Sequence, residues 1–186
     1  MLIAGAGMSA AQADGMADLQ ARLDAALKGA KSFVVTTLYP AQAYSSTLMV
    51  VAPDRTRLAV AVSANTTDIV TIGQTEYSSK NGATFEKRPA APSAGPPRQS
   101  PGSVKVMGMR PDVRVGSKTY GAFDASVPLG VQVTLTCTYD KKNYRLVRCA
   151  NDEITQRYGK YDDPSNVVDA PKNAVDAPAV DAKQVK

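Results

Sequence analysis

Histidine and tryptophan are absent from this chain of 186 residues, and only two cysteines are present. Without histidine the chain has no Ser-His-Asp or Cys-His nucleophile system, no histidine-ligated metal and no histidine proton shuttle. Two cysteines are also too few for a four-cysteine metal site. The sequence therefore excludes many hydrolase and zinc-enzyme chemistries, and we expect no cofactor.

Long apolar runs are missing as well, because no segment approaches the roughly 20 residues of a membrane span. At the N-terminus, residues 2–10 are small and apolar, and Ala11-Gln12-Ala13 fits the A-x-A cleavage site of a secretory signal peptide. None of the first 13 residues is basic, so the usual n-region is lacking, and a plain Ala/Gly-rich terminus is the alternative. We expect residues 1–13 to be a signal peptide, and the mature chain to be soluble and periplasmic or secreted in a bacterium.

The cysteines, Cys137 and Cys149, lie in strand-like sequence outside any C-x-x-C motif. In an exported protein such a pair indicates a structural disulfide, and two buried free thiols are the alternative. A hairpin turn at residues 140–143 would place Cys137 opposite Leu146. A disulfide therefore requires the second strand to bulge or bend after Leu146.

Periodicity predicts one helix followed by strands. Over residues 14–28 the apolar side chains recur at helical spacing, and Gly29 follows as a stop. Beyond it the period changes to two, which is typical of strands. The strand-like segments are 32–39, 43–51, 55–63, 68–73, 76–79, 83–87, 103–109, 113–118, 120–125, 130–139, 143–148 and 154–161. Tight turns between them predict an antiparallel meander.

Two further segments differ in composition. Five prolines between Pro89 and Gly102 exclude regular structure there, so we expect a long loop. Residues 166–171 recur in altered form as residues 173–178. We expect a signal peptide, then one domain over residues 14–171 that includes the Pro-rich loop at 89–102, and then a disordered tail over residues 172–186.

Several strands are apolar on both faces, for example residues 47–51, 57–62 and 69–72. One helix cannot cover both faces of about ten strands. We therefore expect an α+β fold in which a curved antiparallel sheet, an incomplete β-barrel, wraps around the N-terminal amphipathic helix. The side chains expected to line a lipid-binding cavity inside it are Leu48, Met49, Val60, Val62, Ile69, Ile72, Met107, Met109, Val133 and Leu135. A plain packed core is the alternative.

Positive charge is concentrated between residues 80 and 118, which hold eight Lys and Arg against two acidic residues. Export and the lack of aromatic residues at these positions count against a nucleic-acid partner, and we expect none. A solvated surface is the plainer interpretation of this charge, and an anionic membrane or lipid headgroup is the alternative partner. The residues expected to form a basic rim for it are Lys87, Arg88, Arg98, Lys105, Arg110 and Arg114.

The motifs also follow a familiar order. After the helix come Pro53-Asp54-Arg55-Thr56-Arg57, then Asp68–Gly73 with Tyr77, then the hairpin Asn81–Lys87. The second half contains Gly116 with Tyr120, Tyr139-Asp140, and Tyr158–Pro164. Across about residues 16–171 this series resembles the LolA/LppX-like lipoprotein-carrier superfamily. The resemblance implies a half-barrel around the N-terminal helix with a hydrophobic cavity, which in relatives holds acyl chains.

Two features depart from that family. Phe85 stands where tryptophan is usual, and the Pro-rich segment replaces helices that often close the cavity mouth. From the residues and the resemblance together we expect a non-catalytic carrier or chaperone that binds a lipid or a lipoprotein acyl chain. The alternative is a structural or protein-interaction module on the same fold, with a packed interior, that binds an envelope protein through the Pro-rich loop and the tail. We expect no enzyme, because Asp152-Glu153 and Asp162-Asp163 lie in turn-like sequence and are explained as turn formers.

Overall fold

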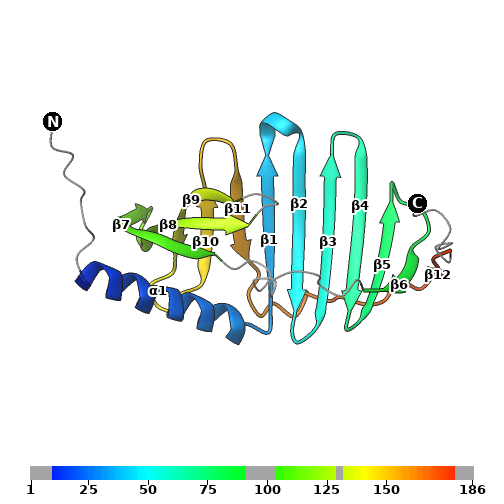
Figure 1. Cartoon of the computed structure of the whole chain (residues 1–186), viewed down its shortest axis with the longest axis horizontal. Coiled ribbons are helices and arrows are strands. Elements are labelled where there is room, and N and C mark those ends of the chain that lie inside the picture. Colours follow the sequence, from blue (N-terminus) through cyan, green and yellow to red (C-terminus); the bar gives the residue numbers. More distant parts are fainter. Residues whose placement is uncertain (1–9, 91–103, 129–131, 179–186) are drawn as a thin grey trace, which may run out of the picture. The chain divides into compact units, whose positions relative to one another are not determined.

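The computed structural model describes residues 10–90, 104–128 and 132–178 (Figure 1). The chain divides into two compact units, of which the first comprises residues 1–30 and 99–159 and the second residues 31–98 and 160–186. Each unit is thus built from two separate stretches of the sequence, and the single domain expected over residues 14–171 stays a prediction. No helix in the described residues is both long enough and apolar enough to cross a membrane.

The first unit contains the helix and five strands. They are α1 (Ala10–Gly29), β7 (Lys105–Val115), β8 (Lys118–Pro128), β9 (Gln132–Tyr139), β10 (Leu146–Ala150) and β11 (Thr155–Gly159). The strands are antiparallel in the order β11-β10-β9-β8-β7. Of the expected signal peptide, residues 1–9 lie outside the described residues and residues 10–13 form the first turn of α1.

The two strands expected at 103–109 and 113–118 form one long strand, β7. Its register against β8 shifts between Val106 and Gly108 and again between Arg110 and Val113. Pro111 lies within the second shift, and its ring nitrogen has no hydrogen to donate to the neighbouring strand. A β-bulge takes up the extra residue without ending the strand.

The core of the first unit lies on one face of its sheet. The pairing places Phe123 opposite Cys137 and Ala125 opposite Leu135, and each of these four side chains is at most 1% exposed. From α1, Leu19 and Leu23 are buried as the predicted apolar stripe requires.

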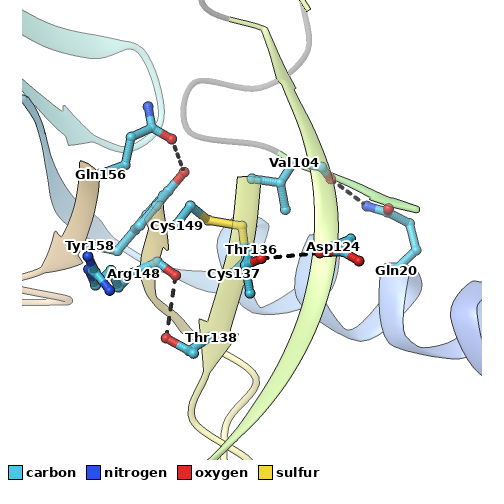
Figure 2. The surroundings of a disulfide bond; sticks show 10 residues. All are labelled: Gln20, Val104, Asp124, Thr136, Cys137, Thr138, Arg148, Cys149, Gln156 and Tyr158. Atoms are coloured by element: carbon cyan, nitrogen blue, oxygen red, sulfur yellow. Dashed lines mark hydrogen bonds between the residues drawn. A yellow bond between two sulfur atoms is a disulfide. The ribbon is translucent and has the colours of Figure 1, made fainter. Parts of the chain in front are cut away.

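The predicted disulfide is confirmed. Cys137 and Cys149 lie directly opposite each other on β9 and β10, with 4.0 Å between their Cα atoms (Figure 2). Tyr139 pairs with Leu146, so the turn covers residues 140–145 rather than the expected 140–143. The register then shifts between Leu146 and Arg148, which is the predicted bulge after Leu146.

The second unit is a meander of six strands joined by a short seventh. They are β1 (Ser32–Tyr39), β2 (Tyr44–Val51), β3 (Arg55–Val62), β4 (Asn65–Ile72), β5 (Thr75–Lys80), β6 (Glu86–Pro89) and β12 (Val175–Asp176), with the 3-10 helix η1 (Pro40–Gln42) between β1 and β2. Strands β1 to β6 are antiparallel to their neighbours, whereas β12 is parallel to β6 (Figure 1). Pro89 ends β6, so the Pro-rich segment begins inside a strand rather than in the predicted loop, and residues 91–102 lie outside the described residues.

Register assigns the side chains of this sheet to two faces. One face, called the Leu48 face, is defined by a row of residues that pair one after another from β1 to β4: Val35, Leu48, Leu58 and Ile69. Met49, Arg57, Val70 and Tyr77 are neighbours across β2 to β5 and define the Met49 face.

Residues 162–178, called the strap below, run from the start of β1 to β6 and can be followed in Figure 1. The Asn166 side-chain amide donates to Ser32 Oγ at 2.8 Å, and Arg55 Nη1 donates to the carbonyl of Val168 at 3.1 Å. Val168 is 2% exposed. The sequence predicted a disordered tail from residue 172, but residues 172–178 continue the strap and form β12, because the edge of β6 offers backbone partners to Val175 and Ala177.

The predicted fold class is confirmed. The chain is α+β, with an N-terminal amphipathic helix and antiparallel strands in a sheet that does not close. Most predicted strands are present within one to three residues, and β1 has the predicted bounds.

Candidate functional site

A pocket of about 380 Å³ lies in the second unit. Its lining residues are Ser45, Ser46, Thr47, Ala59, Val60, Ala61, Thr66, Thr67, Asp68, Ser79, Gly82, Ala83 and Phe85. Seven of these residues come from the Met49 face, on four successive strands: Ser45, Thr47, Ala59, Ala61, Thr66, Asp68 and Ser79. The pocket is therefore a depression above this face of the sheet.

Small side chains create the floor of the pocket. Serine, threonine and alanine at alternate positions of β2 and β3 extend only a short distance above the backbone, whereas Leu or Met at the same positions would fill the space. Ala59 pairs with Thr47 on one side and with Asp68 on the other, so these short side chains lie side by side across three strands.

The connection between β5 and β6 forms one wall. Asn81 and Gly82 both have positive φ, 51° and 72°, and turn the chain after β5. Ser79 Oγ then donates to the carbonyl of Ala83 at 2.5 Å. On the far side, the backbone N–H of Val175 in the strap donates to the carbonyl of Phe85 at 2.9 Å. The wall is thus fixed between the floor of the pocket and β12.

Asp68 is the one charged residue of the lining, and Arg57 neutralises it. Arg57 Nε donates to Asp68 Oδ1 at 3.1 Å and Nη2 to Oδ2 at 2.6 Å, a two-pronged ion pair between β3 and β4. The hydrogen bond to Asp68, and after it the carboxylate's charge, raise the pKa of Arg57 against the opposing effect of burial. The pocket therefore presents hydroxyls, methyl groups and one aromatic ring, with no net charge of its own.

The predicted cavity-lining residues do not form one lining. Leu48, Val60, Val62 and Ile69 lie on the Leu48 face, whereas Met49 and Ile72 lie on the Met49 face. Val60 alone of the ten lines the pocket.

The other four predicted lining residues belong to the first unit. Met107 and Met109 are 50% and 41% exposed on β7, Val133 is half-buried on β9, and Leu135 is 1% exposed in the core. A strand that is apolar on both faces does not reveal which face adjoins a cavity, so the expected lining stays a prediction.

The six residues of the predicted basic rim come from both units. Lys87 and Arg88 lie on β6 of the second unit, Lys105, Arg110 and Arg114 lie on β7 of the first unit, and Arg98 is outside the described residues. Arg88 is paired with Glu76 and Arg110 with Asp124, each across neighbouring strands. Part of the positive charge of the predicted rim is therefore neutralised by ion pairs within the sheets.

Of the two acidic pairs, Asp162-Asp163 contains a turn former in Asp163, whereas the turn at Asp152-Glu153 is formed by the neighbouring Asn151. Asp163 accepts the backbone N–H of Ser165, and Asn151 Oδ1 accepts those of Glu153 and Ile154. In the described part of the chain, no three His, Cys, Asp or Glu side chains come close enough together to hold a metal ion.

Sequence reasoning missed the pocket residues because it searched for large apolar side chains. The informative pattern in the sequence is one of small side chains rather than large apolar ones. Small residues at i and i+2 occur on neighbouring strands, as Ser45 with Thr47 and Ala59 with Ala61, and Asn81-Gly82 follows close by.

Comparison with known proteins gives matches among solved structures alone. No family model matches the chain, and no curated protein matches it. The structure of MucB in complex with MucA(peri) is similar over 77% of this chain, with 14% identity and a TM-score of 0.42. This chain spans about half of the MucB chain, 53% of its length.

A LolA superfamily protein from Nitrosomonas europaea is similar over 84% of this chain and 94% of its own, with 8% identity and a TM-score of 0.34. Both similarities are low in identity and in TM-score.

Proposed function

We propose that this chain is a non-catalytic binding protein of the bacterial cell envelope that holds an acyl chain, of a lipid or a lipoprotein, in the pocket on the Met49 face. The observation that carries the proposal is the pocket itself. Its volume of about 380 Å³ falls within the roughly 300–1,000 Å³ of pockets that bind small molecules.

The surface of the pocket suits a narrow, uncharged chain. The methyl groups of Ala59, Ala61 and Ala83 and the ring of Phe85 offer apolar contact, and the threonine methyl groups add to it. Burial of each methylene contributes roughly 0.8 kcal/mol. Because Arg57 already pairs with Asp68, an apolar ligand leaves no isolated charge in the pocket.

The envelope location is supported by the cysteine pair and by the N-terminal sequence. The Cys137–Cys149 disulfide is of a kind that persists in oxidising compartments such as the periplasm. The A-x-A sequence at residues 11–13 fits a cleavage site for export.

A fluorescent fatty acid, dansyl-undecanoic acid, tests the proposal. We expect saturable binding by the intact chain and displacement by palmitate. The variant Ala59→Trp puts a large ring on the pocket floor at an exposed position, so it should weaken binding at least tenfold without loss of the fold.

The matched control is Ala64→Trp, which adds the same ring to the exposed turn between β3 and β4, outside the pocket lining. Its affinity should stay within twofold of the parent. Absence of saturable binding, or equal weakening by both variants, would reject the pocket as an acyl-chain site. Mass spectrometry of lipids retained by the purified chain gives an independent reading.

A further inference from the structure

Strand β7 is a sheet edge. Within the described residues its single strand neighbour is β8, so the backbone groups on its other side have no strand to pair with. At the start of this edge a side chain of α1 fills that role. Gln20 Nε2 donates to the carbonyl of Val104 at 3.0 Å (Figure 2). The N–H of Val106 donates to Gln20 Oε1 at 2.7 Å. The amide takes the place that one peptide group of an added strand would occupy.

Beyond Val106 the edge is apolar and exposed. Eight large hydrophobic side chains are exposed in the described part of the chain, and four of them lie on β7. They are Met107, Met109, Val113 and Val115, with exposures of 50%, 41%, 39% and 62%. Such a concentration on one strand marks a surface for interaction.

The same edge carries positive charge that the described residues do not neutralise. Arg114 donates to the carbonyl of Gly116, and neither Arg114 nor Lys118 has an ion-pair partner among the described residues. By contrast, Arg110 is paired with Asp124, and Asp112 is paired with Lys141. Because side chains alternate along a strand, Val113 and Val115 share one face and Arg114 points to the other.

A segment of this chain already shows what such an edge can bind. Strand β12 adds to the edge of β6: the N–H of Val175 donates to the carbonyl of Phe85, just before β6, and the N–H of Ala177 donates to the carbonyl of Lys87, at 2.9 Å each. Asp176 lies opposite Lys87 in this pairing. An acidic residue between two apolar ones is thus accepted against a basic strand edge.

We propose that the end of β7, Val113 to Val115, is a docking edge for an extended segment of a partner protein in which apolar and acidic residues alternate. Backbone hydrogen bonds would extend the sheet by one strand. The apolar residues would pack on Val113 and Val115, and the acidic residue would lie near Arg114. This inference is independent of the proposed acyl-chain pocket, which lies in the other unit.

The irregularities of β7 restrict the partner to a short segment. The register shifts before Gly108 and before Val113 and the proline at 111 interrupt the edge. Bulges and prolines on edge strands prevent two identical edges from pairing along their whole length. A second copy of β7 is therefore disfavoured, whereas a segment of three or four residues fits beside Val113–Val115.

A peptide with the sequence of residues 166–178, which contains Val-Asp-Ala-Pro twice, is a suitable probe. In NMR titrations of the intact chain we expect the amide signals of Val113–Val115 to shift. A peptide with lysine in place of both aspartates should bind at least fivefold more weakly, and added salt should weaken the parent peptide.

Variants of the chain complete the test. Arg114→Glu should weaken the parent peptide at least fivefold, and the double variant Val113→Thr/Val115→Thr should also weaken it, since threonine keeps strand propensity but reduces apolar contact. The matched control is Lys142→Glu, the same charge change at an exposed loop position. Melting temperatures verify that each variant is folded.

Three results would overturn the proposal: equal effects of Arg114→Glu and Lys142→Glu, equal binding of the lysine peptide, or shifts confined to β6. The last result would mean that the peptide merely replaces β12 at Lys87.

Discussion

At the scale of single residues, Gly121 is the position in the first unit where a side chain fits least. A Cβ atom there would lie 2.2 Å from Cζ of Tyr139, whose ring covers Gly121 from the facing strand. Tyr139 is held in turn by stacking on Tyr144, with 5.6 Å between ring centroids, and Arg22 of α1 lies over the Tyr144 ring. Burial is the main cause of the raised pKa of Tyr139.

We therefore expect Gly121→Ala to lower the free energy of unfolding by about 1–3 kcal/mol, because the methyl group displaces the Tyr139 ring from its stack. Urea unfolding followed by tyrosine fluorescence measures this. The control is Gly159→Ala in β11, where a Cβ atom would meet nothing within 4 Å. If both variants unfold at the same urea concentration, the packing of the Tyr139 ring does not require glycine at position 121.

At the scale of elements, the disulfide links β9 to β10 across one register position. The double variant Cys137→Ala/Cys149→Ala should lose about 3 kcal/mol of stability, since the open chain regains the entropy that closure of the loop removed. Urea unfolding with and without reductant measures the loss. Reductant should destabilise the parent chain and leave the double variant unchanged. If reductant leaves the stability of the parent chain unchanged, the disulfide contributes nothing to that stability.

Also at the scale of elements, we expect the start of the strap to depend on pH through Asp163. Asp163, near its start, accepts hydrogen bonds from the Ser165 hydroxyl and from the Ser165 backbone N–H, and these lower its pKa from the ordinary 3.8. A carboxyl group with a lowered pKa in the folded state stabilises the fold above its unfolded pKa. That contribution is lost as the pH falls through the folded value.

For the variant Asp163→Asn we therefore expect a difference in melting temperature from the parent that is constant above about pH 5 and shrinks below pH 3.8. Hydrogen exchange at residues 165–168 should increase in the parent over the same acidic range. The control is Asp169→Asn, an exposed carboxylate on the strap 3.7 Å from Arg55. A difference that stays constant down to pH 2.5 would contradict the role given to Asp163.

At the scale of the whole molecule, local pattern and tertiary arrangement contribute differently. The period of two in the predicted strand at residues 130–139 puts Leu135, Cys137 and Tyr139 on one face, and all three are buried. The bulge before Cys149 was also predictable, because a disulfide beside a four-residue turn leaves three residues to be accommodated; the longer turn takes up two of them and the bulge the third. These features depend on neighbours in one hairpin.

The pocket was not predictable in the same way. Its lining comes from four strands and from the β5–β6 connection, and its wall is fixed by Val175, which lies 90 residues beyond Phe85 in the sequence. Likewise, Lys87 belongs to the second unit and Lys105 to the first, although both lie in one basic stretch of the sequence.

The sequence by itself determined the α+β class, the helix, the strand pattern and the paired cysteines, because each follows from side-chain period or from a pair of residues. Only the tertiary structure decided which face of the second sheet is hollow and which strand is left at an edge. The physical reason is that the hydrophobic pattern of the sequence determines how much apolar surface must be buried. The strand register and the neighbouring elements determine which residues bury that surface, and both are set only when the strands assemble.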